Sequence, residues 1–241
     1  MLDYKAVFAE KEKVLFVTAH PDDVDVFFGG LICLLRKEGK QVKVVVVTNG
    51  ARGSRDNNIP EAELAKKRIA EEEGALSCLG LEKENFLTLN YLDGEVENSF
   101  ELIGDIARVI REFKPEICCT HEPNGIYYPS PGSDKFFVNH RDHRNIGMSV
   151  VDAVYPFARD RSFFPEHYAD GLSQHKVYEL YFTPEFSCNC KIDVSSVTAE
   201  KRKALSSHKS QFTPELVEKL LNRFCEGKNY YECGNHLKLD W

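Results

Sequence analysis

Two short segments of the chain bring imidazole and carboxylate groups together. The first is His20-Pro21-Asp22-Asp23, and the second is Asn139-His140-Arg141-Asp142-His143. A catalytic zinc ion keeps about three protein ligands and one open position, and a hydrolase also needs a base beside it. The residue types in these two segments therefore indicate a metal site that activates water.

The spacing within each segment supports this interpretation. His20 and Asp23 are three residues apart across a turn that opens a helix, so both side chains can point at one place. His140 and His143 are also three apart and share one side of a helical turn. A His/Asp/His set suits Zn²⁺ or a related first-row metal. Asp22 would lie near the metal without binding it, as a general base does.

Two further roles follow from the second segment. His140 would act as an acid toward the leaving nitrogen or hold a developing oxyanion. Asp142 could orient His140, as carboxylates around a metal site often do. Taken alone, each segment also has an ordinary structural explanation, because Asp23 could cap a helix and His-x-x-His is a common pattern.

Alternating strand-like and helix-like segments would position these groups. The first motif follows the apolar run Val14–Thr18. The pattern predicts strands at 14–19, 42–48, 86–89, 116–120, 177–182 and 191–194. It predicts helices at 24–38, 61–79, 100–113, 143–157 and from 198 to a break at Pro214. This order predicts an α/β fold, a Rossmann-like and mostly parallel sheet with helices on both faces. The site would lie at the carboxyl ends of the strands. Residues 121–139 are expected to form a long loop that delivers the second motif.

The composition narrows the class of protein. The 241 residues fit one domain, 1–241, with 42% hydrophobic and 29% charged residues. A net charge of −7 without a basic stripe argues against nucleic acid as a partner. There is no signal-peptide core, and the longest apolar runs are strand length, so we expect no membrane span and a cytoplasmic protein. The eight cysteines are expected to be free thiols.

Several segments together resemble a known family. Residues 19–30, AHPDDVDVFFGG, resemble the opening motif of the LmbE-like / PIG-L family of zinc-dependent N-acetylglucosaminyl deacetylases, and residues 139–147 resemble its second motif. Further segments resemble other family motifs in the same order, namely 48–54, the helix with Arg68 and Glu71, 89–96, and 203–211 with His208.

The resemblance implies a role for eight residues: His20, Asp23 and His143 as ligands of one Zn²⁺ per chain, Asp22 as the base, His140 with its partner Asp142 at the oxyanion or leaving group, and Arg68 and Asp93 at sugar hydroxyls. It implies hydrolysis of the N-acetyl group of an N-acetylglucosamine-containing small molecule, and a homo-oligomer. It gives Asp25 and His208 no role in the reaction, and His208 is also explained as a hydrogen-bonded structural histidine at a helix end. It also does not choose between Arg159 and Arg161 as an arginine near the reacting carbonyl.

Other functions remain open at this point. A metal-dependent phosphoesterase would usually hold two metals. A nucleotide-binding module would need G-x-G-x-x-G after the first strand, where this chain has His-Pro-Asp-Asp. A sugar-binding relative without activity would not need Asp22. Aromatic residues in the expected loops could stack on a sugar ring, namely Tyr91, Tyr127, Tyr128, Phe136 and Phe137.

Overall fold

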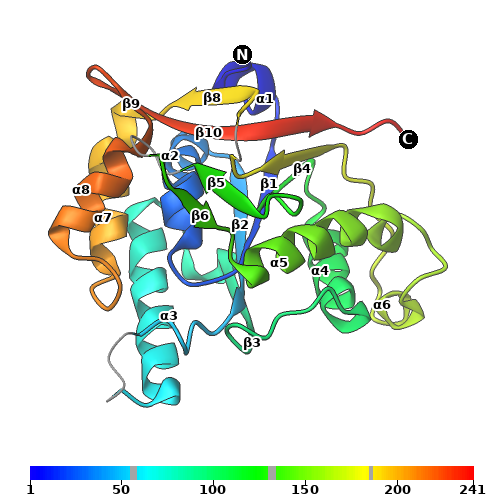
Figure 1. Ribbon diagram of the computed structural model, residues 1–241. Coiled ribbons are helices and arrows are strands. Elements are labelled where there is room, and N and C mark those ends of the chain that lie inside the picture. The colour runs from blue at the N-terminus through cyan, green and yellow to red at the C-terminus, as the bar shows by residue number, and fades with distance from the viewer. Residues whose placement is uncertain (55–58, 130–133, 185–186) are drawn as a thin grey trace.

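The computed structural model of the protein describes residues 1–54, 59–129, 134–184 and 187–241. Its main sheet has the strand order β3-β2-β1-β4-β7-β10-β8, and β9 pairs with β10 (Figure 1). The strands are β1 (Lys13–Thr18), β2 (Gln41–Thr48), β3 (Phe86–Tyr91), β4 (Ile117–Thr120), β7 (Glu179–Phe182), β8 (Cys190–Asp193), β9 (Cys225–Glu226) and β10 (Asn229–Lys238). The strands from β3 to β7 run parallel, and β10 is antiparallel to β7 and β8. The predicted mostly parallel α/β sheet is confirmed.

Helices cover both faces of the sheet. They are α1 (Tyr4–Val7), α2 (Asp23–Lys37), α3 (Glu61–Cys78), α4 (Phe100–Phe113), α5 (Arg141–Asp152), α6 (Pro165–Ala169), α7 (Thr198–Ser207) and α8 (Pro214–Leu221). One face packs on α2, α3 and α7, and the other packs on α4 and α5 (Figure 1).

Strand β1 shows why the sheet needs cover on both sides. Val14 and Phe16 belong to the core under α2, whereas Leu15 and Val17 belong to the core under α4 and α5. Successive side chains of a strand point to opposite faces, so an unbroken apolar run is buried on both. Strand β1 therefore lies in the middle of the sheet, and the turn after it opens at the sheet's carboxyl edge.

Three local expectations need correction. Residues 121–139 contain a hairpin of β5 (Tyr127–Pro129) and β6 (Phe136–Val138) in place of a loop without secondary structure. The last helical region ends at Ser207, and Pro214 starts α8 because its fixed φ suits the first helical position. The helix expected from residue 143 begins at Arg141, since the His140 side chain caps it.

All eight cysteines are free thiols, as expected. Within the described ranges, no helix combines the length and the apolar character that crossing a membrane requires.

Candidate active site

The turn between β1 and α2 holds the first motif in a tight conformation. Asp22 has φ 118°, in the left-handed region that disfavours side chains with a Cβ. The backbone N–H of His20 donates to Asp23 Oδ2 at 2.8 Å. Strained backbone of this kind is held in place by its surroundings and clusters at functional sites.

Three imidazole rings converge on one carboxylate oxygen. Asp23 Oδ2 lies 3.2 Å from His20 Nδ1 and 3.2 Å from His143 Nε2. His121 Nε2 lies 3.5 Å from the same oxygen. His20, from the turn after β1, and His143, from the first turn of α5, thus both lie against Asp23 at the start of α2.

Sequence reasoning missed His121. It follows β4, the neighbour of β1, and its ring stacks on His143 with centroids 4.0 Å apart. Its Nε2 accepts the N–H of Ala19 at 3.1 Å. Burial, helped by the charge of His143, lowers the pKa of His121 to about 4 despite the nearby Asp23 carboxylate, so the ring is neutral at pH 7. The available signal was a histidine directly after a buried strand.

Two more carboxylates face the other side of the His20 ring. His20 Nε2 lies 3.3 Å from Asp93 Oδ1 and 3.3 Å from Asp142 Oδ2. Burial lowers the pKa of His20, but its bonds to Asp142, Asp23 and Asp93 raise that pKa well above its usual value. Gly94 also donates its N–H to Asp142 Oδ2 at 2.7 Å. Asp93 therefore lies within the site.

His140 faces the open side of the cluster. Its side chain is 47% exposed, and its ring meets that of His20 edge-on with centroids 4.7 Å apart. His140 Nδ1 accepts the backbone N–H of Asp142 at 3.2 Å, so a neutral ring carries its proton on Nε2. The carboxylate of Asp142 is 3.9 Å from Nδ1. The hydrogen bond between these two residues is made by the backbone.

Arg68 donates hydrogen bonds to the turn between β1 and α2. Its Nη2 donates to Pro21 O at 2.7 Å and to Asp22 Oδ2 at 2.9 Å, and its Nη1 donates to Gly50 O at 2.8 Å. Burial raises the pKa of Asp22 to about 6, against the opposing charge of Arg68. Arg68 is buried, and these donors bind acceptors of the protein itself.

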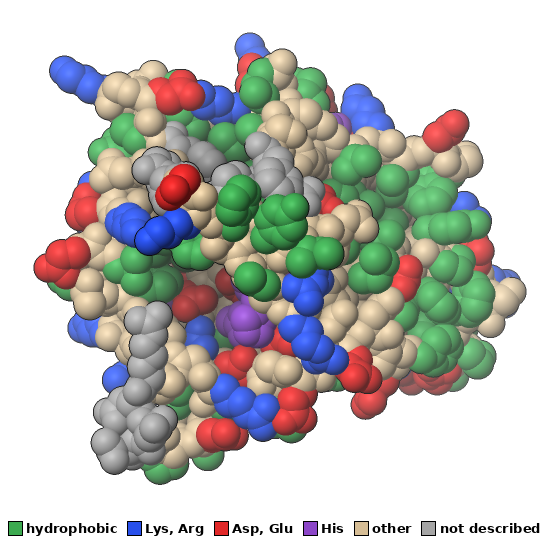
Figure 2. Space-filling model, in the orientation of Figure 1, with side chains coloured by type: hydrophobic (Ala, Val, Ile, Leu, Met, Phe, Trp, Pro, Cys, Tyr) green, Lys and Arg blue, Asp and Glu red, His purple; other side chains and the backbone are tan. Residues whose placement is uncertain are grey.

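His140 and His143 line a hollow of about 230 Å³. Figure 2 shows histidine in this depression, with hydrophobic side chains along one rim and charged ones along the other. Tyr128, Phe137 and the unpredicted Arg223 line it.

Other predicted neighbours of the site lie elsewhere. Arg159 stacks on Tyr155, and Arg161 lies over Tyr168. Tyr91 donates to Asp105.

The donor atoms suit a zinc-class ion. Single ligand atoms of His20, His140 and His143 lie within 4.8 Å of one another, as do those of Asp23, His121 and His143. Neutral imidazole nitrogen and carboxylate oxygen are the usual ligands of catalytic zinc besides thiolate. The residues present therefore fit a metal.

A second cluster lies behind this site. His208 Nε2 is 2.7 Å from Asp25 Oδ2 and 3.6 Å from Glu72 Oε2, and all three side chains are fully buried. Burial raises the pKa of Glu72, and the charges of Asp25 and Asp22 raise it further. Burial lowers the pKa of His208, but Asp25 outweighs this and leaves it raised.

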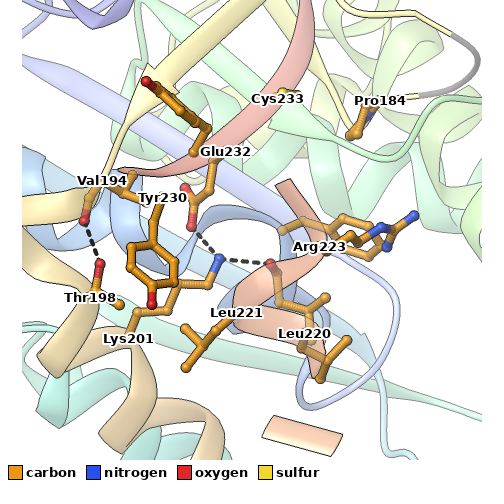
Figure 3. Close-up of a pocket in the computed structure, with 13 residues that line it drawn as sticks. Pro184, Val194, Thr198, Lys201, Leu220, Leu221, Arg223, Tyr230, Glu232 and Cys233 are labelled. Atoms are coloured by element: carbon orange, nitrogen blue, oxygen red, sulfur yellow. Dashed lines mark hydrogen bonds and ion pairs between the residues drawn. The ribbon is translucent and has the colours of Figure 1, made fainter. Parts of the chain in front are cut away.

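A lysine–glutamate pair fastens α2 to the neighbouring elements (Figure 3). Glu232 of β10 accepts the N–H groups of Gly30 and Leu31 at 2.7 and 2.9 Å. Lys201 of α7 donates to Glu232 at 2.5 Å and to Val26 O at 2.9 Å. A Cβ on Gly30 would come within 2.6 Å of Val194, so this close approach needs glycine.

Comparisons with known proteins identify the family of this chain. Residues 15–154 match the family model PIG-L, described as GlcNAc-PI de-N-acetylase. The chain is 31% identical over 219 residues to diacetylchitobiose deacetylase of Thermococcus kodakarensis, covering 90% of this chain and 77% of the relative. It is 28% identical to 1D-myo-inositol 2-acetamido-2-deoxy-alpha-D-glucopyranoside deacetylase of Rhodococcus erythropolis, covering 85% and 83%. The solved N,N'-diacetylchitobiose deacetylase from Pyrococcus horikoshii is 27% identical, with TM-score 0.82 over 95% of this chain and 85% of that one.

Proposed function

Because the chain belongs to the PIG-L family of de-N-acetylases, we propose that it hydrolyses the N-acetyl group of an N-acetylglucosamine-containing small molecule. The products are acetate and a free amino sugar. The observation that carries the proposal is the convergence of imidazole nitrogens on Asp23 Oδ2, with the carboxylate of Asp22 on the same turn.

We further propose that His20, Asp23 and His143 hold one Zn²⁺ per chain. When bound, such an ion polarises a carbonyl and makes hydroxide available at neutral pH. His121 packs on His143 and accepts a backbone N–H, so we assign it the support of that ring.

Asp22 and His140 carry the proton transfers in this proposal. Asp22 accepts the proton of the attacking water, and a carboxyl pKa raised to about 6 suits a base that works near neutral pH. His140 lines the hollow, where its Nε2–H group stabilises the developing oxyanion or protonates the leaving nitrogen. The exposure of this ring gives it access to substrate.

The two predicted sugar-binding residues, Asp93 and Arg68, differ in what they contact. Asp93 remains a candidate for binding a sugar hydroxyl, because one of its oxygens lies beside His20. Arg68 donates to two carbonyls and to Asp22, which supports a role in holding the turn. Tyr128 and Phe137 line the hollow and offer faces on which a sugar ring stacks. The homo-oligomer and the cytoplasmic location stay predictions.

The test is acetate release by the purified protein. Substrates are N,N'-diacetylchitobiose, the N-acetylglucosaminyl derivative of myo-inositol, and free N-acetylglucosamine, each with zinc-loaded and chelator-treated protein. We expect acetate release from at least one of them, dependent on metal. The same protein is assayed on a phosphomonoester, with metal counted by elemental analysis. Phosphate release with two ions per chain and no acetate would replace this proposal with the phosphoesterase.

A further inference from the structure

Asp22 has a backbone conformation that its own residue type does not favour. Its φ of 118° places it in the region that glycine prefers. The carboxylate can serve as a base only while this conformation is kept, since it sets the direction of the side chain. Something in the surrounding structure must therefore hold the peptide before Asp22.

Glu72 makes the contact that does so. The backbone N–H of Asp22 donates to Glu72 Oε2 at 2.8 Å. Glu72 is fully buried on α3, and Arg68, one helical turn earlier on the same face, donates to Pro21 O and to the Asp22 side chain. One face of α3 thus contacts the catalytic turn at three groups, namely the backbone N–H of Asp22, the carbonyl of Pro21 and the carboxylate of Asp22.

The buried cluster keeps Glu72 in position. His208, at the end of α7, lies between Asp25 Oδ2 and Glu72 Oε2 at 2.7 and 3.6 Å. Buried carboxylates require a partner, and the Nε2 atom of His208 faces both of them. Asp25 lies in the first turn of α2, so His208 joins α2, α3 and α7 directly behind the turn.

We propose that Glu72, supported by His208 and Asp25, is a positioning residue that holds Asp22 in its left-handed conformation and so aims the catalytic carboxylate. The proposal rests on the function proposed above. It gives a role to Asp25 and His208, for which the sequence offered none. It also makes α3, which contributes no metal ligand, a part of the catalytic apparatus.

The neighbouring Glu71 provides a matched control. It is also a carboxylate on α3, but it accepts from the backbone N–H and hydroxyl of Ser210 at 3.0 and 2.6 Å. It therefore anchors α3 to the turn after α7 without touching the catalytic turn. A general loosening of α3 would affect Glu71 and Glu72 variants alike.

The experiment compares Glu72→Leu, Glu72→Gln and Glu71→Leu. Leucine removes the acceptor for the Asp22 N–H, whereas glutamine keeps one. Misplacement of a reacting group by about 1 Å costs about 10²-fold. We expect Glu72→Leu to lower kcat by about that factor with KM and metal content unchanged, Glu72→Gln to restore most of kcat, and Glu71→Leu to retain it. Equal losses in the Glu71 and Glu72 leucine variants, or near wild-type kcat in folded Glu72→Leu, would overturn the proposal.

A second measurement does not depend on the reaction. Hydrogen exchange at the Asp22 amide, followed by NMR, should be slow in the wild type, Glu72→Gln and Glu71→Leu, and fast in Glu72→Leu. Unchanged protection in Glu72→Leu would refute the contact. If the wild type released no acetate from any substrate while this exchange pattern held, the proposed function would fail and the positioning contact would stand.

Discussion

Two clusters of histidine and carboxylate groups lie on either side of the first turn of α2. Asp23 with His20, His121 and His143 forms the open cluster, and Asp25 with Glu72 and His208 forms the buried one. Each contains a set of ligand atoms within 4.8 Å of one another. Residue types and spacing therefore do not distinguish them.

Access to solvent distinguishes them. His140 and His143 of the open site line the hollow, whereas all three side chains of the buried cluster are enclosed. A substrate can reach only the first. The comparison shows that histidine and carboxylate groups of the same types can have different roles. A cluster that borders a hollow can act on a substrate, whereas a cluster enclosed by protein can only position other residues.

The sharpest test of this division is the loss of metal. His143→Ala removes a proposed ligand from the open site, so we expect the metal content to fall. Turnover should also fall, by more than the loss of one transition-state donor typically causes, which is about 10²–10³-fold. Elemental analysis after dialysis and zinc reloading gives the first quantity, and acetate release gives the second. Full metal occupancy in this variant would remove His143 from the ligand set.

The next effect should come from the base. Asp22→Asn keeps the side chain's size but cannot take a proton from water, so kcat should fall about 10²–10⁴-fold. Metal content should stay at the wild-type level, because Asp22 is bonded to Arg68 and not to the imidazoles. Near wild-type kcat in this variant would show that another group is the base.

His140→Gln should follow in size. His140 lines the hollow, and a donor that strengthens its bond in the transition state affects kcat more than KM. We expect kcat to fall about 10²–10³-fold. A rise in KM alone, measured over a full substrate range, would instead make His140 a ground-state binding residue.

Asp142→Asn separates two interpretations of the second motif. The sequence suggests that its carboxylate orients His140, which predicts that the double variant loses less than the product of the single losses. In the structure the carboxylate meets His20 and Gly94, while the backbone N–H, kept in asparagine, meets His140. We therefore expect losses of about 10–100-fold in activity or metal affinity. Because His140 and Asp142 both lie against His20, their losses should couple under either interpretation. A loss of metal affinity in Asp142→Asn supports the contact with His20, whereas a loss of kcat with full metal affinity would restore the first interpretation.

Much of the fold could be predicted because strong local signals agree. The apolar run of β1, the turn and α2 were predicted to within a residue. Strand β10 was not, because Asn229–Lys238 mixes buried Glu232, Cys233 and Gly234 with polar residues. Its place between β7 and β8 comes from pairing with distant strands, which a local pattern does not contain.

Some residues of the site could likewise be predicted from the sequence, and others could not. The approach of His20 and His143 to Asp23 could be predicted because both motifs were expected at the same edge of the sheet. Glu72 could not be predicted, since it stands in the run Glu71-Glu72-Glu73, which looks like solvent-facing helix. Its helical phase decides otherwise: Leu64, Arg68 and Glu72 share one buried face of α3 at spacings of four. His121 required knowing that β4 lies beside β1.

The smallest effect on turnover should come from His208→Gln. Glutamine can still donate to Asp25 but cannot carry the charge that the raised pKa of His208 favours, so Asp25 loses its ion-pair partner. Breaking a buried ion pair costs about 3–5 kcal/mol, and urea unfolding should show a loss of that order in the free energy of unfolding. Glu72 still accepts the Asp22 N–H, so kcat should fall by less than in Asp142→Asn. Metal content should be unchanged, in contrast to His143→Ala. If His208→Gln lost its metal as His143→Ala is expected to, the buried cluster would itself be a metal site and the division between the two clusters would be wrong.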